Sequence, residues 1–369
     1  MSLVQTLGVE IGVRTAGSPE AERAAEAIAE ALRAVGLEPA FQELPLLGYD
    51  AEEPELEIDG ERWDAGSCMY AHPTDGVVEG RVRWIGTSPA EGLFPPAHSF
   101  AVEDAAGREL ARLEMSPFGG DAIPFLVGPR QIVVGPTAFI SGTDANRLLE
   151  VEDATARVRV GGRFVPGRTD RNVVAVIPGA SEETIVVSAH YDSVWRGPGT
   201  IDNATGVEGL RRLAERFAAG PRRPRAITFC AFAAEEIGLI GARRFVSEAN
   251  LRGTLERIRG VVNLDCIAHG EPLGVYASPA ELLGRAQAHA ESLGLTERYE
   301  AVFSTTARGV DSVPFADEGI PAATIAHFPY PEYHTPRERL ELVDEQRLAD
   351  AVDLAAALVE SQLERPIGR

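Results

Sequence analysis

Apolar, β-branched runs alternate with amphipathic stretches throughout the second half of the chain. From Asn172 onward this pattern predicts buried strands at residues 173–177, 185–188, 227–232, 261–264 and 323–325. Between these runs, apolar residues recur at helical spacing, most clearly at 279–293 and 348–363. Such alternation is typical of a parallel sheet with helices on both faces. We therefore expect an α/β fold with a mixed, largely parallel sheet flanked by helices.

The pattern changes between residues 46 and 164. Short β-like runs separated by Gly, Pro and Asp occupy residues 82–85, 131–134, 138–140 and 156–160. Before this stretch, Ser18-Pro19-Glu20 begins an amphipathic helix that ends at Gly36, and a short strand-like piece lies near Phe41. These observations predict one α/β domain formed by residues 1–45 and 165–369, with a mostly β domain inserted at 46–164.

Polar residues capable of binding a metal follow three of the predicted strands. Because the carboxyl ends of parallel strands meet at one edge of a sheet, these side chains are expected to converge there. A further carboxylate lies in the turn before the helix that begins near Val207, and a further histidine follows the last predicted strand. The candidates are His190, Asp192, Asp202, Glu235, Glu236, Asp265 and His334.

Single members of this set have ordinary structural explanations. Asp202 could simply cap a helix, and His190 could be a hydrogen-bonded core histidine. Several buried carboxylates together, however, cost several kcal/mol each unless a cation offsets them. Imidazole and carboxylate ligands suit zinc. Since one catalytic zinc takes three protein ligands, five ligands with a bridging carboxylate indicate two zinc ions per chain.

The charge of the chain narrows its partners. With 35 Lys+Arg against 56 Asp+Glu the net charge is -21, which repels phosphate backbones and anionic lipid surfaces. Nucleic acid and membrane are therefore not expected as partners. The sequence contains no lysine, which excludes Schiff-base chemistry and a Walker-A phosphate site. The hydrolase motifs H-E-x-x-H and G-x-S-x-G are also absent from the sequence.

The cysteines and the first residues bear on the compartment. Cys68, Cys230 and Cys266 form no C-x-x-C pair, so no disulfide framework is expected. The chain opens without a charged and apolar leader, and no run of 18 apolar residues occurs. We expect a cytoplasmic protein, or a secreted one if a signal peptide has been removed.

The arrangement of these residues resembles that of the co-catalytic dinuclear-zinc aminopeptidase family. The resemblance covers the chain after Asn172 and the opening Gly-Val-Arg-Thr-Ala-Gly-Ser at 12–18. It implies the following roles: His190 and Asp265 on one zinc, Glu236 and His334 on the other, Asp202 as the bridge, Asp192 orienting His190, Glu235 as general base, and Tyr333 stabilising the oxyanion.

The middle segment resembles the protease-associated domain that is inserted in many members of this family. The similarity lies in residues 136–141 and in the exit segment 169–174. Its His72 and His98 have no acidic partner at ligand spacing, so we interpret them as surface or structural residues. One departure from the family pattern is Ser312, which follows Asp311 where relatives commonly carry histidine and which bears on the substrate pocket.

The resemblance implies an aminopeptidase that hydrolyses peptides with a free N-terminus through a hydroxide held by two zinc ions. A carboxypeptidase or dipeptidase is an alternative, with Arg308 beside Asp311 binding a terminal carboxylate. Glutaminyl cyclisation is another alternative. A receptor-like relative without catalysis should lack ligands, and none is missing here. A homodimer is left open.

Overall fold

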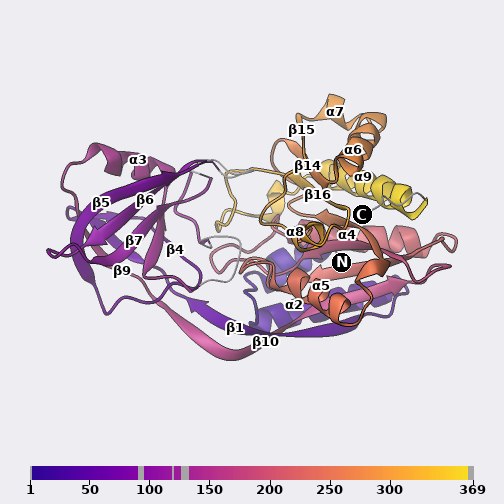
Figure 1. Cartoon of the computed structure of the whole chain (residues 1–369), viewed down its shortest axis with the longest axis horizontal. Helices are drawn as coiled ribbons and strands as arrows, with labels where there is room; N and C mark the ends of the chain where they lie inside the picture. Colours follow the sequence, from indigo (N-terminus) through magenta and orange to yellow (C-terminus); the bar gives the residue numbers. More distant parts are fainter. Residues whose placement is uncertain (1, 90–94, 119, 126–132, 365–369) are drawn as a thin grey trace. The chain divides into compact units, whose positions relative to one another are not determined.

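The computed structural model of the protein describes residues 2–89, 95–118, 120–125 and 133–364. The chain forms two compact units, and Figure 1 shows the course of the chain through both. The first unit consists of Met1–Pro45 and Thr169–Arg369, and the second unit is Leu46–Arg168. The second crossing between the units therefore lies after Arg168, whereas the sequence pattern predicts it after residue 164.

An eight-stranded sheet forms the centre of the first unit, in the order β1-β10-β12-β11-β13-β16-β14-β15. The strands are Ala40–Ala51 (β1), Gly162–Ile177 (β10), Thr184–His190 (β11), Ala226–Phe232 (β12), Ile258–Leu264 (β13), Leu273–Ser278 (β14), Ala301–Ser304 (β15) and Ala322–His327 (β16). The four central strands are parallel to one another, whereas β10 and β14 join them in antiparallel fashion. This confirms the predicted mixed, largely parallel sheet.

Helices cover both faces of this sheet (Figure 1). On one face, α4 (Ala204–Ala218) and α9 (Glu345–Glu364) contact β11 and each other. On the other face, α5 (Ile240–Leu251) and α8 (Val313–Asp317) pack around Phe232 and Phe315. The remaining helical segments of this unit are α1 (Leu3–Gln5), a π-helical turn (Thr6–Ile11), α2 (Pro19–Ala34), α6 (Ala280–Ser292), α7 (Leu295–Arg298) and two 3-10 turns (Leu255–Arg257 and Leu340–Leu342).

The register of the parallel strands aligns their carboxyl ends. His190, the last residue of β11, pairs with Phe232, the last residue of β12. On the other side of β11, Ser188 pairs with Asn263 of β13, and Leu264 of β13 pairs with Ile325 of β16. Residues that follow these four strands therefore emerge at one edge of the sheet, where open α/β folds bind their ligands.

The second unit is built on another eight-stranded sheet, in the order β3-β2-β9-β5-β6-β7-β8-β4. Its elements are Glu55–Ile58 (β2), Glu61–Trp63 (β3), Gly66–Ser67 (β4), Val78–Ser88 (β5), Ala97–Glu103 (β6), Glu109–Met115 (β7), Thr137–Ile140 (β8), Gly142–Glu150 (α3) and Thr155–Arg159 (β9). Neighbouring strands are antiparallel except β7 and β8. Of the predicted run 131–134, residues 131 and 132 lie outside the described residues, and Val134 forms an isolated bridge with Ala71.

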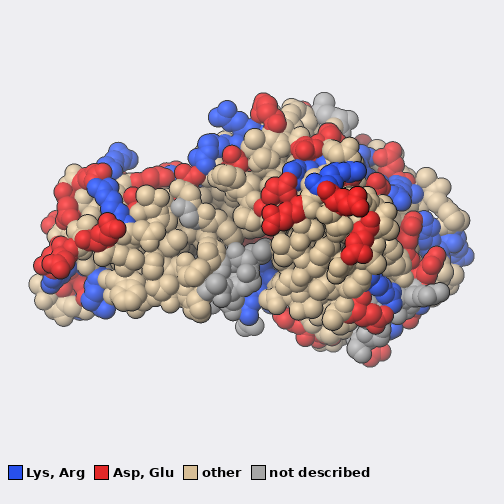
Figure 2. Space-filling model, turned by 90° about the horizontal axis from the view of Figure 1, so that it is seen from above, with Lys and Arg blue, Asp and Glu red and all other residues tan. Residues whose placement is uncertain are grey.

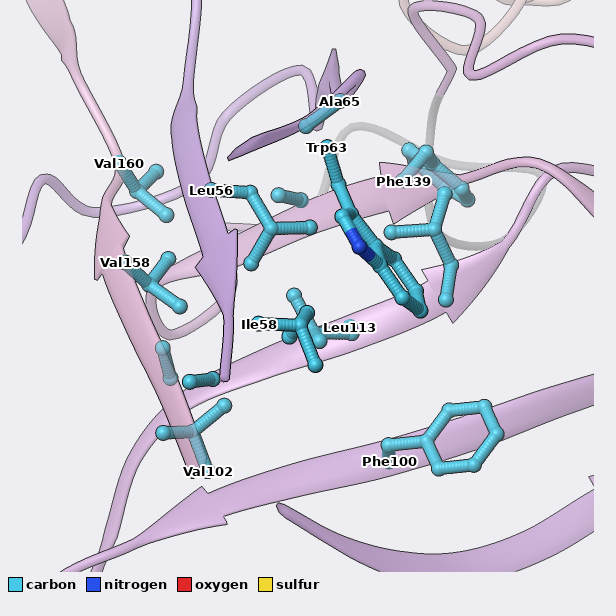
Figure 3. Close-up of a cluster of buried hydrophobic side chains, with 14 of the residues drawn as sticks. Leu56, Ile58, Trp63, Ala65, Phe100, Val102, Leu113, Phe139, Val158 and Val160 are labelled. Carbon is cyan, nitrogen blue, oxygen red and sulfur yellow. The ribbon is translucent and has the colours of Figure 1, made fainter. Parts of the chain in front are cut away.

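Alternating side chains of this sheet form the core of the second unit (Figure 3). Phe100 and Val102 of β6 point inward with Leu113 of β7 and Val158 of β9, and all four are at most 1% exposed. Burying a side chain of this size contributes about 1.5–3 kcal/mol. The unit therefore has a hydrophobic core of its own, as the mostly β pattern predicts.

Acidic and arginine side chains are interspersed on the face shown in Figure 2. The three cysteines Cys68, Cys230 and Cys266 are buried. Among the residues that the structure describes, no helix has the length and apolar character needed to cross a membrane.

Candidate metal centre

The candidate ligands lie at the carboxyl edge of the central parallel strands. His190 ends β11, and Asp265 follows β13 directly. Glu235 and Glu236 lie in the turn between β12 and α5. Asp202 precedes Asn203, the N-cap of α4, and His334 lies in the irregular segment after β16. Five separate segments of the chain thus contribute side chains to one location.

Asp202 lies between the two histidines. Its Oδ1 is 3.0 Å from His190 Nε2, and its Oδ2 is 3.4 Å from His334 Nε2. His190 Nε2 is also 3.6 Å from Asp265 Oδ1, and His334 Nε2 is 3.2 Å from Glu236 Oε2. Donor atoms that share one tetrahedral zinc at roughly 2.0–2.1 Å lie about 3.3 Å from each other. The observed separations fit a cation on each side of the Asp202 carboxylate.

The hydrogen bonding of these carboxylates is incomplete. Asp202 Oδ1 and Glu236 Oε1 are buried and have no hydrogen-bond partner within the described part of the chain. Possible donor atoms of His190, Asp202 and Glu236 lie within 4.8 Å of one another, and so do those of Asp202, Asp265 and Cys266. Because an unpaired buried carboxylate is costly, the donors fit a bound cation. Their imidazole and carboxylate chemistry suits zinc.

The pKa values describe the same imbalance of charge. Burial and repulsion by Asp202 raise the pKa of both Glu236 and Asp265 above the usual range. Burial alone would lower the pKa of His334, but Glu236 and Asp202 raise it to about 10. Burial would also lower the pKa of His190, but Glu235 and the neighbouring carboxylates raise this pKa well above its usual value. The site therefore favours added positive charge, which protons or divalent cations can supply.

Asp192 holds the turn that carries the two glutamates. Its Oδ1 accepts the backbone N–H of Glu235 at 3.0 Å, and its Oδ2 accepts that of Glu236 at 3.2 Å. Asp192 Oδ1 also lies 3.6 Å from His190 Nδ1, beyond hydrogen-bond distance. Asp192 therefore contacts the glutamate turn directly and lies beside the imidazole that it is predicted to orient.

The side chains of Glu235 and Glu236 face different histidines. Glu235 Oε2 is 4.0 Å from His190 Nε2, whereas Glu236 Oε2 is nearest to His334. Burial raises the pKa of Glu235 well above its usual range, and the negative charge of Asp311 adds to this. The raised pKa favours the protonated, neutral form of the Glu235 carboxyl group.

Tyr333 packs directly on a candidate ligand. Its ring stacks on that of His334, with centroids 3.7 Å apart and planes 20° apart. Burial raises the pKa of the Tyr333 phenol well above its usual value, so the group is a hydrogen-bond donor. The stacking accounts for its place in the site, and the oxyanion role stays a prediction.

The residues behind the alternative functions lie in different environments. Arg308 is exposed, whereas Asp311 is fully buried and both of its oxygens lack a hydrogen-bond partner among the described residues. Ser312 is also buried, and its Oγ lies 2.7 Å from Thr324 Oγ1. The Ser312 hydroxyl therefore contacts another side chain inside the fold.

Among the described residues, three of the seven non-glycine residues with positive φ are candidate ligands or lie next to one. Ala234, Cys266 and His334 have φ values of 57°, 53° and 59°, in the left-handed region that L-residues rarely adopt. Ala234 precedes Glu235, and Cys266 follows Asp265. Each such residue costs on the order of 1–3 kcal/mol, and strain of this kind is characteristic of functional sites.

Three buried charged residues beside the centre were not predicted from the sequence. Arg14 is fully buried and donates hydrogen bonds to the loop after β11. Glu338 accepts the backbone N–H of Asp202 at 3.1 Å. Asp170 accepts the N–H of Gly17 at 2.7 Å and the hydroxyl of Tyr191 at 2.6 Å. The available signals were weak, namely a carboxylate four residues after His334 and one arginine in the segment 12–18.

The similarity to known protein families covers the part of the chain that contains the candidate ligands. A sequence model described as peptidase family M28 matches residues 172–359. The chain is 26% identical over 240 residues to aminopeptidase YwaD of Bacillus subtilis, covering 61% of this chain and 50% of YwaD. It is 25% identical over 284 residues to the probable lipoprotein aminopeptidase LpqL of Mycobacterium tuberculosis, covering 71% and 56%. This chain therefore spans about half the length of these relatives.

Solved structures extend the similarity to both units. The fold is similar to that of BSAP, a zinc aminopeptidase from Bacillus subtilis, with a TM-score of 0.71 and 21% identity over 97% of this chain and 93% of BSAP. An aminopeptidase from Aneurinibacillus sp. strain AM-1 gives a TM-score of 0.68 and 23% identity, covering 99% and 93%. At such identities the similarity concerns the fold alone.

Proposed function

Because the chain belongs to peptidase family M28, we propose that it is a zinc-dependent aminopeptidase that removes N-terminal residues from peptides. The observation that carries the proposal is the Asp202 carboxylate, which presents one oxygen to each of two buried histidines at the spacing of shared metal ligands. The similarity to YwaD and LpqL, both named as aminopeptidases, supports the same activity.

The centre is proposed to hold two zinc ions per chain. His190 and Asp265 would bind one ion, Glu236 and His334 the other, and Asp202 both. When bound, zinc would lower the pKa of its water ligand to near neutrality and would polarise the carbonyl of the scissile bond. Metal analysis of the purified protein tests the stoichiometry, and a single ion at saturating zinc would contradict it.

The protein's own residues would move the proton and hold the geometry. Glu235, with its raised pKa, would take a proton from the attacking water and later donate it to the leaving amine. Asp192 would keep both glutamates in place through their backbone amides. Tyr333 would donate its phenolic proton in a hydrogen bond to the developing oxyanion.

The substrate is proposed to be a peptide with a free α-amino group. The centre is lined by carboxylates of raised pKa, which favour a neighbouring cation over a second carboxylate. A net charge of -21 also attracts cationic N-termini rather than anionic C-termini. The arginine required by a carboxypeptidase, Arg308, is exposed in contrast to the buried Asp311.

Blocked substrates test this proposal directly. We expect an amino-acid arylamide to be hydrolysed and its N-acetyl derivative to be essentially inert, because acetylation removes the positive charge. A peptide amide serves as the control for a free carboxylate and should be cleaved. Hydrolysis of the acetylated compound at a comparable rate, or of substrates with a free C-terminus alone, would contradict the aminopeptidase proposal and favour a carboxypeptidase.

A further inference from the structure

We infer that Arg14 is a positioning residue of the metal centre: its guanidinium fixes the loop between the candidate ligands His190 and Asp202. Glu338 is inferred to fix the Asp202 end of the same segment. The inference rests on the proposed zinc site and assigns it an N-terminal support that lies outside the matched residues 172–359.

The hydrogen bonds of Arg14 reach both ends of the loop. Its Nε donates to the carbonyl of Tyr191, which directly follows His190. Its Nη1 donates to Pro198 O at 2.5 Å, and its Nη2 donates to Gly199 O at 2.7 Å. One rigid, planar group thus ties the start of the loop to its end, which lies three residues before Asp202.

The same guanidinium is itself held in place by the N-terminal segment. Arg14 Nη1 also donates to Gly12 O at 3.1 Å and to Leu7 O at 3.3 Å. The backbone of Arg14 donates to Ser193 Oγ at 3.1 Å, and Ser193 N–H donates back to Arg14 O at 3.3 Å. Since both sides of the contact are hydrogen-bonded, neither the loop nor the arginine can shift alone.

The loop backbone is shaped to admit this group. Gly199 has a φ of +60°, and a Cβ at this position would lie 2.8 Å from Arg14 Nη2 and 2.6 Å from Asp202 O. Only glycine allows the loop to approach the guanidinium this closely. The glycine therefore serves the contact between Arg14 and the ligand loop.

Glu338 acts on Asp202 from a different segment. Its Oε1 accepts the Asp202 N–H at 3.1 Å and a hydrogen bond from the Tyr330 hydroxyl. Glu338 is 1% exposed and Tyr330 is 4% exposed, so water does not compete for these bonds. The backbone of the candidate bridging residue is thereby fixed independently of any metal.

The guanidinium of Arg14 contacts backbone carbonyls and not carboxylates. Within the described residues, no carboxylate oxygen lies within 4.0 Å of its guanidinium, although Glu338, Asp192 and Asp202 are close enough to oppose the fall in pKa that burial causes. All five of its acceptors are backbone carbonyls. Its contribution is therefore geometric, and lysine, a point charge without a planar fork, cannot reproduce it.

Zinc affinity and apo-protein stability separate this role from a purely structural one. The variants are Arg14→Lys, Arg14→Met and Glu338→Met, with Arg222→Met at an exposed arginine as the control. Arg222 also donates to a backbone carbonyl, that of Gly179, but in a turn that carries no candidate ligand. Zinc dissociation constants come from competition with a chromophoric chelator, and unfolding of the metal-free proteins is followed in parallel.

We expect Arg14→Lys and Glu338→Met to weaken zinc binding by about 10- to 100-fold, as loss of residues that orient metal ligands does. Arg222→Met should bind zinc like the wild type even if its unfolding temperature falls. Wild-type zinc affinity in Arg14→Lys would overturn the inference. So would tighter binding in Arg14→Met, since that result would mean that the arginine acts through its charge alone.

The remaining outcomes are also decisive. If Arg14→Met fails to fold, Arg14→Lys still tests the positioning role, because lysine keeps a positive charge on a side chain of similar length. If the wild-type protein binds no zinc, the proposed function fails before any variant is compared. If the wild type binds zinc and the variants bind it with the same affinity, the proposed function stands and the positioning role alone is rejected.

Discussion

Carboxylates serve opposite purposes in the two units. At the candidate metal centre of the first unit, Asp202, Glu236 and Asp265 lie close together, and no arginine is within 4.0 Å of them among the described residues. On the sheet of the second unit, carboxylates are paired with arginines, as in Arg157 with Glu57 at 3.1 Å and Arg159 with Glu55 at 2.7 Å.

The difference separates the candidate ligands from the acidic residues of the surface. Exposed pairs between strands contribute about 0–1 kcal/mol each, and water solvates them whether or not they pair. Buried carboxylates without arginine partners are unfavourable until a cation or proton arrives. The net charge of -21 therefore does not locate the site, because burial without a counter-charge distinguishes the site from the surface.

The largest effect is expected from substituting, one at a time, the two adjacent glutamates of the first unit. Glu235→Gln should lower turnover by roughly 10²- to 10⁴-fold with zinc content unchanged, because it removes a general base but no ligand. Glu236→Gln should lose zinc, since its oxygen lies beside His334 at ligand spacing. Metal analysis and steady-state kinetics on both variants check this. Turnover of Glu235→Gln within a few-fold of wild type would reject its assignment.

A smaller effect is expected at His327, a buried histidine of the same unit whose neutral form is favoured. His327 is fully buried, its Nδ1 lies 3.2 Å from Arg347 Nη1, and burial together with Arg347 lowers its pKa to about 4. In the unfolded chain the imidazole takes up a proton with the ordinary pKa of 6.5. The unfolding free energy is therefore unaffected by this histidine above pH 6.5 and falls as the pH is lowered from 6.5 toward 4.

His327→Gln should therefore flatten the fall in unfolding free energy between pH 7 and pH 4, by on the order of 3 kcal/mol. Denaturant unfolding at several pH values measures it. Other groups, including Asp170 with its raised pKa, titrate in the same window and remain in both proteins, so the difference between them isolates His327. Equal pH dependence in the two proteins would show that this histidine is not held neutral.

The smallest effect is expected on the sheet of the second unit. Arg157→Ala removes contacts with Glu57 at 3.1 Å and Glu79 at 3.6 Å, but the arginine side chain is 50% exposed. Loss of such pairs should cost less than about 1 kcal/mol and should leave turnover and zinc content unchanged. A loss of zinc in this variant would erase the contrast between paired and unpaired carboxylates.

Local patterns in the sequence determined most of the architecture. The strands and helices after Asn172 appear close to the predicted positions, for example α6 at Ala280–Ser292 against the predicted 279–293. The helix start at Ser18 is also as predicted, since its Oγ accepts the N–H of Ala21 at 3.0 Å. Such features follow from side-chain periodicity and capping, which act over a few residues. In the second unit, the runs expected from the sequence correspond to β5, β8 and β9, whereas β2, β3, β6 and β7 were not predicted.

The candidate ligands were also predictable, because polar residues that directly follow buried strands converge wherever the strands are parallel. What only the tertiary structure decided is how they are held. Arg14 is one of many arginines in the sequence, and although the segment 12–18 belongs to the resemblance, it does not indicate what the guanidinium binds. Its carbonyl partners, such as Tyr191 and Gly199, are recruited by folding from positions far along the chain. Backbone carbonyls occur at every residue, so a side chain that binds them leaves no pattern in the sequence.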